Sequence, residues 1–293
     1  MQRLDMPKLF LTLEESVNVR YTDDGINASS SIHSHNFIEF AYLVEGHGVE
    51  IINNNTFELG PGYFSMIFPW QTHELYFDHS YSVKYFFVAI SMDNFLGAGS
   101  VALELRDLFF SSASDSTPWT YYYEGNNAKK LELAFQEMFT EYTTRKKWWE
   151  LSVKSKIYDV LIMFDRQCRD NQLNETTAKV NSSIRHHNSD ILFYIYNNFK
   201  EEISLSHLSE YFGLSQNYLS TIIKASLGLT FQDFLHNLRL KYACTLLACT
   251  SMSVTDVAYA SGFQSYRNFE RFFRKNYATS PTQFRYANKK LYP

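Results

Sequence analysis

Four side chains in the first third of the chain have types and spacing suited to chemistry. Two histidines stand one residue apart, a glutamate follows four residues later, and a third histidine lies further on: His33, His35, Glu39 and His73. Imidazole nitrogens and carboxylate oxygens bind transition metals, and they also hydrogen-bond polar organic molecules. Three interpretations are therefore open: polar groups of a ligand pocket, structural hydrogen bonds at strand ends, and a metal centre.

The segment that carries these residues reads as short strands separated by turns. Apolar or alternating runs of four to ten residues are FIEFAYLVEG, GVEIINN, TFELGPGYFSMIFP, HELYF and KYFFVAIS, between residues 37 and 91. Asn53–Asn55 and Gly60–Gly62 have the composition of turns. Many short strands at regular spacing predict a β-sandwich or small barrel.

The middle of the chain changes to a helical period. Apolar residues between 127 and 166 form two stripes, interrupted near TTRKKWWE, which predicts two amphipathic helices that pack on the barrel or pair with a second subunit. Residues 169–183 are polar and lose this period. The predicted organisation is a β-barrel at 1–125, a helical segment at 126–168, a linker at 169–183 and a further domain at 184–293.

Charge separates this last domain from the rest of the chain. From residue 184 onward there are 12 Lys and Arg against 7 Asp and Glu, whereas the remainder has 15 against 24. A basic third attached to an acidic remainder favours a nucleic-acid-binding domain.

Several other classes of protein find no support in the sequence. It has no glycine-rich phosphate loop, no Ser/His/Asp order and no CxxC pair, and the three cysteines are odd in number. It has no apolar run long enough for a membrane span and no signal-peptide pattern at the start. We expect a cytoplasmic protein that is not an enzyme, with no cofactor and no membrane partner.

Residues 204–226 have the pattern of a helix-turn-helix. Ser204 is placed to cap a first helix, Gly213 supplies the turn, and Ser215 is placed to cap a second helix. In DNA-binding proteins the second helix of this motif enters the major groove. The outward positions of the predicted second helix are all polar: Gln216, Asn217, Ser220, Thr221 and Lys224.

The same pattern returns at residues 253–277. Gly262 makes the turn, 49 residues after Gly213, and Ser265 is placed to cap the helix that follows. Its outward positions include Tyr266, Arg267, Asn268, Arg271, Arg274 and Lys275. A helical stretch of some 17 residues lies between the two motifs, and a rod of roughly 25 Å would place the recognition helices in adjacent segments of the major groove.

Residues from about 190 to 286 resemble the DNA-binding domain of the AraC/XylS family of bacterial transcription regulators. The resemblance is carried by LSHLSEYFGLS, LRLKYACTLL and VTDVAYASGFQSYRNFERFFRKNYATSPTQFR, in which Gly262 to Arg285 fit the most diagnostic motif of the family. It implies that DNA is bound by Ser215, Gln216, Asn217, Ser220, Thr221, Lys224, Ser265, Tyr266, Arg267, Asn268 and Arg271.

The histidine segment resembles the cupin barrel, in whose enzymes two histidines, a glutamate and a later histidine hold a metal. It also resembles the sensor domains of AraC-type regulators, which bind small molecules without metal. On this second resemblance we expect no metal and an effector pocket lined by inward-facing residues: His33, His35, Phe37, Glu39, Tyr42, Phe68, Trp70 and His73. Aromatic faces beside a carboxylate and imidazoles suit a sugar or another polar molecule.

The predicted fold class is α+β and multidomain, with an N-terminal cupin-like β-barrel and following helices, then an all-α domain with two helix-turn-helix units. The predicted function is a ligand-responsive, sequence-specific activator of metabolic genes that acts as a homodimer on double-stranded DNA together with RNA polymerase. Two alternatives stay open: a metal-dependent cupin enzyme with an accessory DNA-binding domain, and a barrel that only dimerises.

Overall fold

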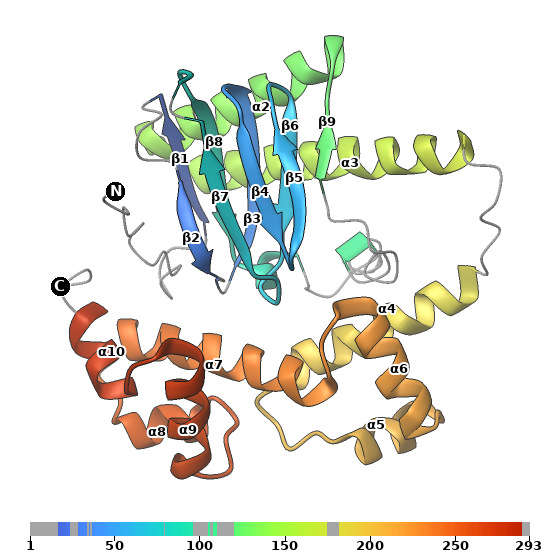
Figure 1. The fold of residues 1–293 in the computed structure, drawn as a ribbon, viewed down its shortest axis with the longest axis vertical. Coiled ribbons are helices and arrows are strands. Elements are labelled where there is room, and N and C mark those ends of the chain that lie inside the picture. The colour runs from blue at the N-terminus through green and yellow to red at the C-terminus, as the bar shows by residue number, and fades with distance from the viewer. Residues whose placement is uncertain are drawn as a thin grey trace. The chain divides into compact units, whose positions relative to one another are not determined.

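A computed structural model describes residues 17–23, 29–33, 35, 37–78, 80–95, 105, 108–109, 120–174 and 182–288 (Figure 1). The chain divides into two compact units. The first contains the strands and two long helices, and the second contains the C-terminal helices. Among the described residues, no helix combines the length and the apolar character that a membrane span requires. Residues 1–16, which lack a signal-peptide pattern, lie outside the described residues.

Within the described residues of the first unit, nine short strands build two antiparallel sheets (Figure 1). The strands are β1 Val17–Thr22, β2 Ser30–His33, β3 Ile38–Glu45, β4 Gly48–Ile52, β5 Asn55–Leu59, β6 Tyr63–Ile67, β7 His73–Phe77, β8 Lys84–Ile90 and β9 Thr120–Tyr122. One sheet has the order β1-β8-β3-β6-β9 and the other β2-β7-β4-β5. The five runs predicted between residues 37 and 91 are confirmed as β3 to β8, whereas β1, β2 and β9 were not predicted.

Alternation along β3 assigns its side chains to two faces. Glu39 pairs with Ile67 of β6 and Ala89 of β8, so these residues share a face. Tyr42 lies on the opposite face, where its ring stacks on Phe135 with centroids 5.5 Å apart. Phe64 of β6 lies on this face too, 5.6 Å from Phe164.

Two helices cover that second face: α2 Gly125–Thr144 and α3 Trp149–Asn174 (Figure 1). They bury the predicted stripes, including Leu131 and Phe135 in α2 and Ile157 and Leu161 in α3. The predicted interruption between two helices is confirmed, but α3 continues six residues beyond the predicted domain end at 168. Of the predicted linker, residues 175–181 lie outside the described residues.

The second unit consists of helices with well-formed caps. They are α4 Ser182–Asn198, α5 Leu205–Phe212, α6 Gln216–Leu227, α7 Phe231–Cys249, α8 Val254–Ala260, α9 Tyr266–Tyr277 and α10 Pro281–Asn288. The side chains of Ser204, Ser215 and Ser265 each accept a hydrogen bond from the backbone N–H three residues on, as the sequence predicted. The α5–α6 and α8–α9 pairs are the two predicted helix-turn-helix units.

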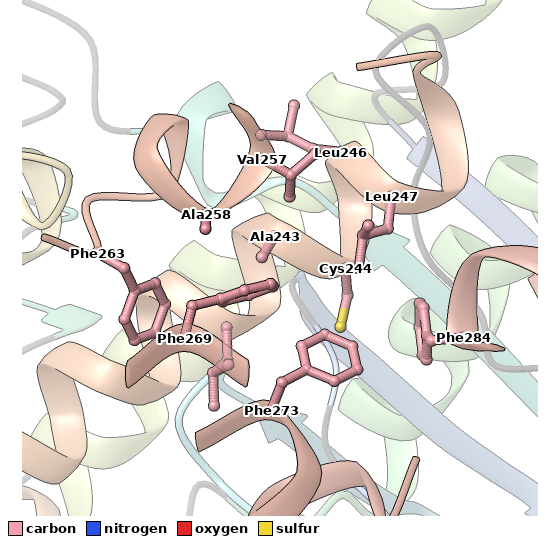
Figure 2. Packing of buried hydrophobic residues seen from close by; sticks show 11 residues of the cluster. Ala243, Cys244, Leu246, Leu247, Val257, Ala258, Phe263, Phe269, Phe273 and Phe284 are labelled. Carbon is pink, nitrogen blue, oxygen red and sulfur yellow. The ribbon is translucent and has the colours of Figure 1, made fainter. Parts of the chain in front are cut away.

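The core around the second of these pairs is aromatic (Figure 2). Phe269 and Phe273 of α9 point toward Ala243 and Cys244 of α7, and Phe284 of α10 packs edge-on against Phe273 at 5.4 Å. All five side chains are essentially inaccessible to solvent. Burial of a phenylalanine contributes about 1.5–3 kcal/mol, so this cluster fixes the orientation of α9 against α7.

Candidate functional site

The first candidate recognition helix is α6. Leu219, Ile222 and Ile223 are buried and fix its inner face. Gln216, Asn217, Thr221 and Lys224 are exposed, while Ser220 is half-buried. The hydroxyl of Thr221 donates to the backbone oxygen of Asn217 one turn earlier, which leaves its oxygen able to accept a hydrogen bond. Tyr218, exposed on 42% of its surface, belongs to the same face and was not predicted as a site residue.

The second candidate recognition helix is α9, and its polar face is cationic. Arg267, Asn268 and Arg271 are exposed, with Arg274 and Lys275 one turn further on. The Arg271 guanidinium lies 4.9 Å from the ring centroid of Phe272, and Arg274 forms a 2.8 Å ion pair with Glu270. Arg267 and Arg271 are therefore the cations of this face best placed to contact an anionic partner.

Three of the predicted DNA-binding residues have structural duties. Ser215 and Ser265 cap α6 and α9, so their hydroxyls already accept backbone hydrogen bonds. Tyr266 is half-buried and packs against the core, 6.2 Å from the ring centroid of Phe269. These three positions mark the start of each helix, where exposed backbone N–H groups favour a phosphate.

An arginine of α7 is hydrogen-bonded to the connection between α4 and α5. Arg239 of α7 is buried, and its guanidinium donates to the backbone oxygens of Phe199 at 2.7 Å and Glu201 at 2.8 Å. Gly262 packs at the same place, because a Cβ there would lie 2.7 Å from the backbone oxygen of Lys200. The turn of the second motif is therefore in contact with both α7 and the α4–α5 connection.

In the first unit, four side chains come together between the sheets: His33, His35, Glu39 and His73. His35 Nε2 lies 3.1 Å and His73 Nε2 3.6 Å from Glu39 Oε2, and the rings of His33 and His73 have centroids 4.2 Å apart. Glu39, His35 and His73 are all at least 97% buried. Phe37 completes this group by stacking on His35 at 4.0 Å.

Burial sets the protonation of this group. It raises the pKa of Glu39, and it lowers the pKa of His33 to about 4, with help from His73. The Nδ1 of His35 lies 2.9 Å from the Phe37 backbone oxygen, and a carbonyl only accepts, so this nitrogen carries a proton. His35 Nε2 faces Glu39 Oε2 at 3.1 Å, and burial favours the neutral form of that carboxyl over the charged one.

The same residues also fit a metal ion. His33, Glu39 and His73 each offer one ligand atom, and these atoms lie within 4.8 Å of one another. His33 is hydrogen-bonded through Nδ1 to the Ser31 oxygen at 2.9 Å, an arrangement that leaves Nε2 for a ligand. Two imidazoles and a carboxylate are a ligand set that transition metals accept.

Sequence reasoning missed two further members of the buried group, Glu50 of β4 and Tyr63 of β6. Glu50 Oε1 lies 3.6 Å from His73 Nδ1, and the Tyr63 hydroxyl donates to Glu50 Oε2 at 2.9 Å. Burial and the neighbouring Glu50 raise the pKa of Tyr63 above its ordinary range. Glu50 stands between the apolar Val49 and Ile51, which by alternation is the pattern of an outward side chain, so GVEII gives no signal for its burial.

Three other residues were predicted to line the pocket: Tyr42, Phe68 and Trp70. The expected inward orientation of Tyr42 is wrong: its hydroxyl donates to the Ala128 backbone oxygen in α2 at 3.2 Å, because it occupies the other face of β3 from Glu39. Phe68 and Trp70 stack on each other at 5.0 Å in the connection between β6 and β7, and both are buried. The buried group therefore unites His33, His35, Phe37, Glu39 and His73 of the predicted set.

Two protein-family models match the chain. Residues 17–146 match the AraC-like ligand binding domain, and residues 208–287 match a helix-turn-helix domain. A transcriptional regulator of Staphylococcus aureus strain MSSA476 is 41% identical over 92 residues, which is 31% of this chain and 12% of the relative. The transcriptional activator RhaS of Enterobacter sp. strain 638 is 36% identical over 97 residues, 33% of this chain and 35% of RhaS. The chain thus spans a small part of these curated relatives.

The two-unit architecture has a counterpart among solved structures. ToxT from Vibrio cholerae superposes with a TM-score of 0.53 over 92% of this chain and 97% of that one, at 14% identity. At this identity the likeness concerns the fold alone. A sensing β domain followed by an all-α domain with two helix-turn-helix units is thereby confirmed. With an AraC-like ligand binding domain and an AraC-type helix-turn-helix domain in one chain, the protein belongs to the AraC family of transcriptional regulators.

Proposed function

We propose that the protein is a sequence-specific DNA-binding regulator that a small molecule controls through the first unit. The observation that carries this proposal is the pair of recognition helices on opposite ends of α7. Each has a buried apolar face and an exposed polar one, and α7, with 19 residues, is about 28 Å long. This length is close to the separation of successive major-groove segments on one side of DNA.

Within this function, α9 supplies most of the phosphate affinity and α6 supplies base contacts. Arg267 and Arg271 are suited to guanine edges or phosphates, and Gln216 and Asn217 to adenine. Ser215 and Ser265 place the helix starts beside the DNA backbone, with Ser220, Thr221, Lys224, Tyr266 and Asn268 as further contacts. Four recognition helices of a homodimer on repeated half-sites would increase specificity.

We further propose that the protein activates metabolic genes together with RNA polymerase. RhaS, named an activator, supports the sign of this regulation. The effector is a small polar organic molecule, for which a sugar is the class suggested by aromatic and carboxylate side chains. The buried group around Glu39 and His73 is the proposed sensor of its presence, because it links both sheets of the domain.

DNA binding is tested by removing the two exposed arginines of α9. The probe is a duplex selected from a random pool by the wild-type protein, and affinity is measured by fluorescence anisotropy at several salt concentrations. Arg267→Ala with Arg271→Ala is expected to weaken binding about 100-fold and to reduce the dependence of log K on log salt by about two.

The matched control is Lys129→Ala with Lys130→Ala, which removes two exposed cations from α2 in the first unit. This variant is expected to bind DNA as the wild type does. Equal affinity of the arginine variant and the lysine variant would contradict the proposal, since α9 would then have no special role. Circular dichroism of both variants establishes that the helices are intact.

A further inference from the structure

Three side chains of the buried group in the first unit meet between its two sheets. His33 of β2 and His73 of β7 are paired across one sheet, and Glu39 comes from β3 of the other sheet (Figure 1). Each residue offers one ligand atom, and these atoms all lie within 4.8 Å of one another. The pairing of the strands therefore gathers two imidazoles and a carboxylate at one place.

The separations within this group are close to those of a coordination sphere. Nitrogen and oxygen ligands lie about 2.1 Å from a zinc ion, so two ligands of a tetrahedral site are about 3.4 Å apart. His73 Nε2 and Glu39 Oε2 are 3.6 Å apart, which is long for a hydrogen bond and close to the spacing of two ligands of one ion. The ligand atom of His33 is at most 4.8 Å from either, a gap that a small rotation of its half-buried ring closes.

The His33 ring is oriented for such a role by the backbone. Its Nδ1 lies 2.9 Å from the Ser31 backbone oxygen. A carbonyl oxygen only accepts, so Nδ1 carries the proton and Nε2 keeps its lone pair for a ligand. His33 is also the half-buried member of the three, whereas Glu39 and His73 are buried. Solvent thus reaches the group at His33, which gives an ion a way in.

Two carboxylates lie in this interior without a cationic side chain beside them. Glu39 is 3% exposed and Glu50 is 1% exposed. Among the described residues, neither forms an ion pair with a lysine or an arginine, and their polar contacts are with imidazoles and a tyrosine hydroxyl. A buried carboxylate is costly unless a positive charge or hydrogen bonds compensate it. A divalent cation between Glu39 and the imidazoles would supply that charge.

Glu50 is an independent sign of an ion at His73. Its Oε1 lies 3.6 Å from His73 Nδ1 and has no hydrogen-bond partner among the described residues, whereas its Oε2 accepts from Tyr63. A metal bound at Nε2 of a histidine leaves the proton on Nδ1, and metal-bound histidines commonly donate it to a carboxylate. A metal at His73 Nε2 would therefore direct a donor at the buried oxygen of Glu50 that lacks one.

We propose that His33, Glu39 and His73 bind one divalent transition-metal ion, with Glu50 as the hydrogen-bond acceptor of His73. Mixed nitrogen and oxygen ligands suit ions such as Zn²⁺, Co²⁺ or Fe²⁺, whereas Mg²⁺ and Ca²⁺ prefer oxygen alone. The ion joins β2 and β7 of one sheet to β3 of the other. This site departs from the expectation of a metal-free first unit. It is independent of the proposed function, since a chain that failed to bind DNA would still hold the ion.

Metal binding is measured on the full chain without a histidine tag, after metal has been removed with EDTA. Zn²⁺ is titrated in competition with a chromophoric chelator, and Co²⁺ is followed by its visible absorption. We expect about one ion per chain and no sulfur-to-cobalt charge-transfer band, because the site contains no cysteine. Zn²⁺ is also expected to raise the Tm, since it binds the folded chain. A chain that binds neither ion, or binds Co²⁺ through sulfur, would overturn the proposal.

Two variants locate the ion. Glu39→Gln keeps the size of the side chain and removes its charge, and His33→Ala removes an imidazole from a half-buried position. Each is expected to weaken Zn²⁺ binding at least about 100-fold. The matched control is His47→Ala, which removes an exposed histidine between β3 and β4 and leaves binding unchanged. Circular dichroism of the metal-free variants checks the fold, and Glu39→Gln decides alone if His33→Ala does not fold. Zn²⁺ binding by the ligand variant as tight as that of His47→Ala would place the ion elsewhere and overturn the site.

A third variant tests the role of Glu50 as a positioning residue. Glu50→Gln is expected to weaken Zn²⁺ binding about tenfold while the number of ions per chain stays the same. It is also expected to shift the visible absorption of bound Co²⁺, because His73 becomes a weaker donor, and a general loss of stability would not produce that shift. Glu58→Gln, an exposed position on the neighbouring strand β5, is the control and leaves affinity and spectrum unchanged. If Glu50→Gln behaves as Glu58→Gln does, Glu50 has no part in the site.

Discussion

The two helix-turn-helix units share a sequence pattern but differ in charge and in packing. The exposed face of α6 carries one cation, Lys224, whereas α9 carries four. The turn of the first helix-turn-helix, α5–α6, is open, because nothing lies within 4 Å of a Cβ built on Gly213. The turn of the second is closed in by Lys200 and Arg239 around Gly262. The second helix-turn-helix, α8–α9, is thus packed more closely against the rest of the domain and carries more cations.

This difference suggests that the two helix-turn-helix units have different roles in DNA binding. Phosphate contacts hold a protein on DNA whatever the sequence, and base contacts select among sequences. A closely packed, cationic α9 is suited to holding the protein on DNA, and α6, with amide side chains and the single cation Lys224, is suited to selecting the sequence. A repeated motif therefore does not imply a repeated role.

The turn glycines offer the largest test of this comparison. Gly262→Ala forces both a φ of +88° on alanine and a Cβ against the Lys200 backbone, so we expect a loss of about 3 kcal/mol or more in the free energy of unfolding. Gly213→Ala changes only the left-handed conformation, at φ +67°, and is expected to cost about 1 kcal/mol. Urea unfolding followed by circular dichroism measures both.

Equal losses in the two variants would mean that the second turn is no more enclosed than the first. Should Gly262→Ala prove too unstable to purify, the enclosure of this turn is tested by the free energy of unfolding of Arg239→Lys. This milder change keeps the charge but removes the paired donation to the Phe199 and Glu201 oxygens. A stability as high as that of the wild type would then contradict the enclosure of the second turn.

Local signals explain why the helix-turn-helix units were predictable. The predicted caps were Ser204, Ser215 and Ser265, whose side-chain oxygens accept a backbone hydrogen bond in the folded chain. The predicted turns were Gly213 and Gly262, because glycine readily adopts a positive φ. The strands from β3 to β8 followed from the same kind of local alternation. Helix α4 was not predicted, since its polar start gives no clear apolar stripe.

The buried group shows what local signals omit. His33, Glu39 and His73 come from three strands of two sheets, and their meeting depends on which strands pair. Glu39 and Tyr42 were both placed inward. Residues three apart in a strand point to opposite faces, so the two assignments were incompatible and that of Tyr42 was wrong. β9 lies far along the sequence from its partner β6, and three residues are too few for a pattern.

A smaller effect is expected from the neutral side chains of α6. Gln216→Ala with Asn217→Ala removes two amides that are exposed at the start of the helix. The affinity for the selected duplex is expected to fall about tenfold, with no change in its salt dependence, because no cation is lost. Anisotropy on the selected duplex and on a random one measures both. A loss of equal size on the random duplex would show that α6 does not select sequence.

The smallest expected effect is a change of the free energy of unfolding with pH, which arises from His236 in the C-terminal helical domain. His236 of α7 packs on Phe272, with centroids 3.9 Å apart, and stacks on Phe263. Burial lowers the pKa of His236, Arg239 and Arg271 lower it further, and Asp233 opposes them. The folded chain therefore favours the neutral ring, while the unfolded chain takes up a proton below about pH 6.5. Stability from this residue is present above that pH and is lost as pH falls toward the lowered pKa.

The measurement is the difference in free energy of unfolding between the wild type and His236→Gln at pH 7.5 and at pH 5.5. Other histidines, including His33, titrate in both proteins and cancel in this difference. The advantage of the wild type over the variant is expected to shrink at the lower pH, by less than about 1 kcal/mol because His236 is only half-buried. An advantage that grows on acidification would mean that the folded second unit prefers the charged ring, and the close contact of α7 with the turn and α9 would have to be revised.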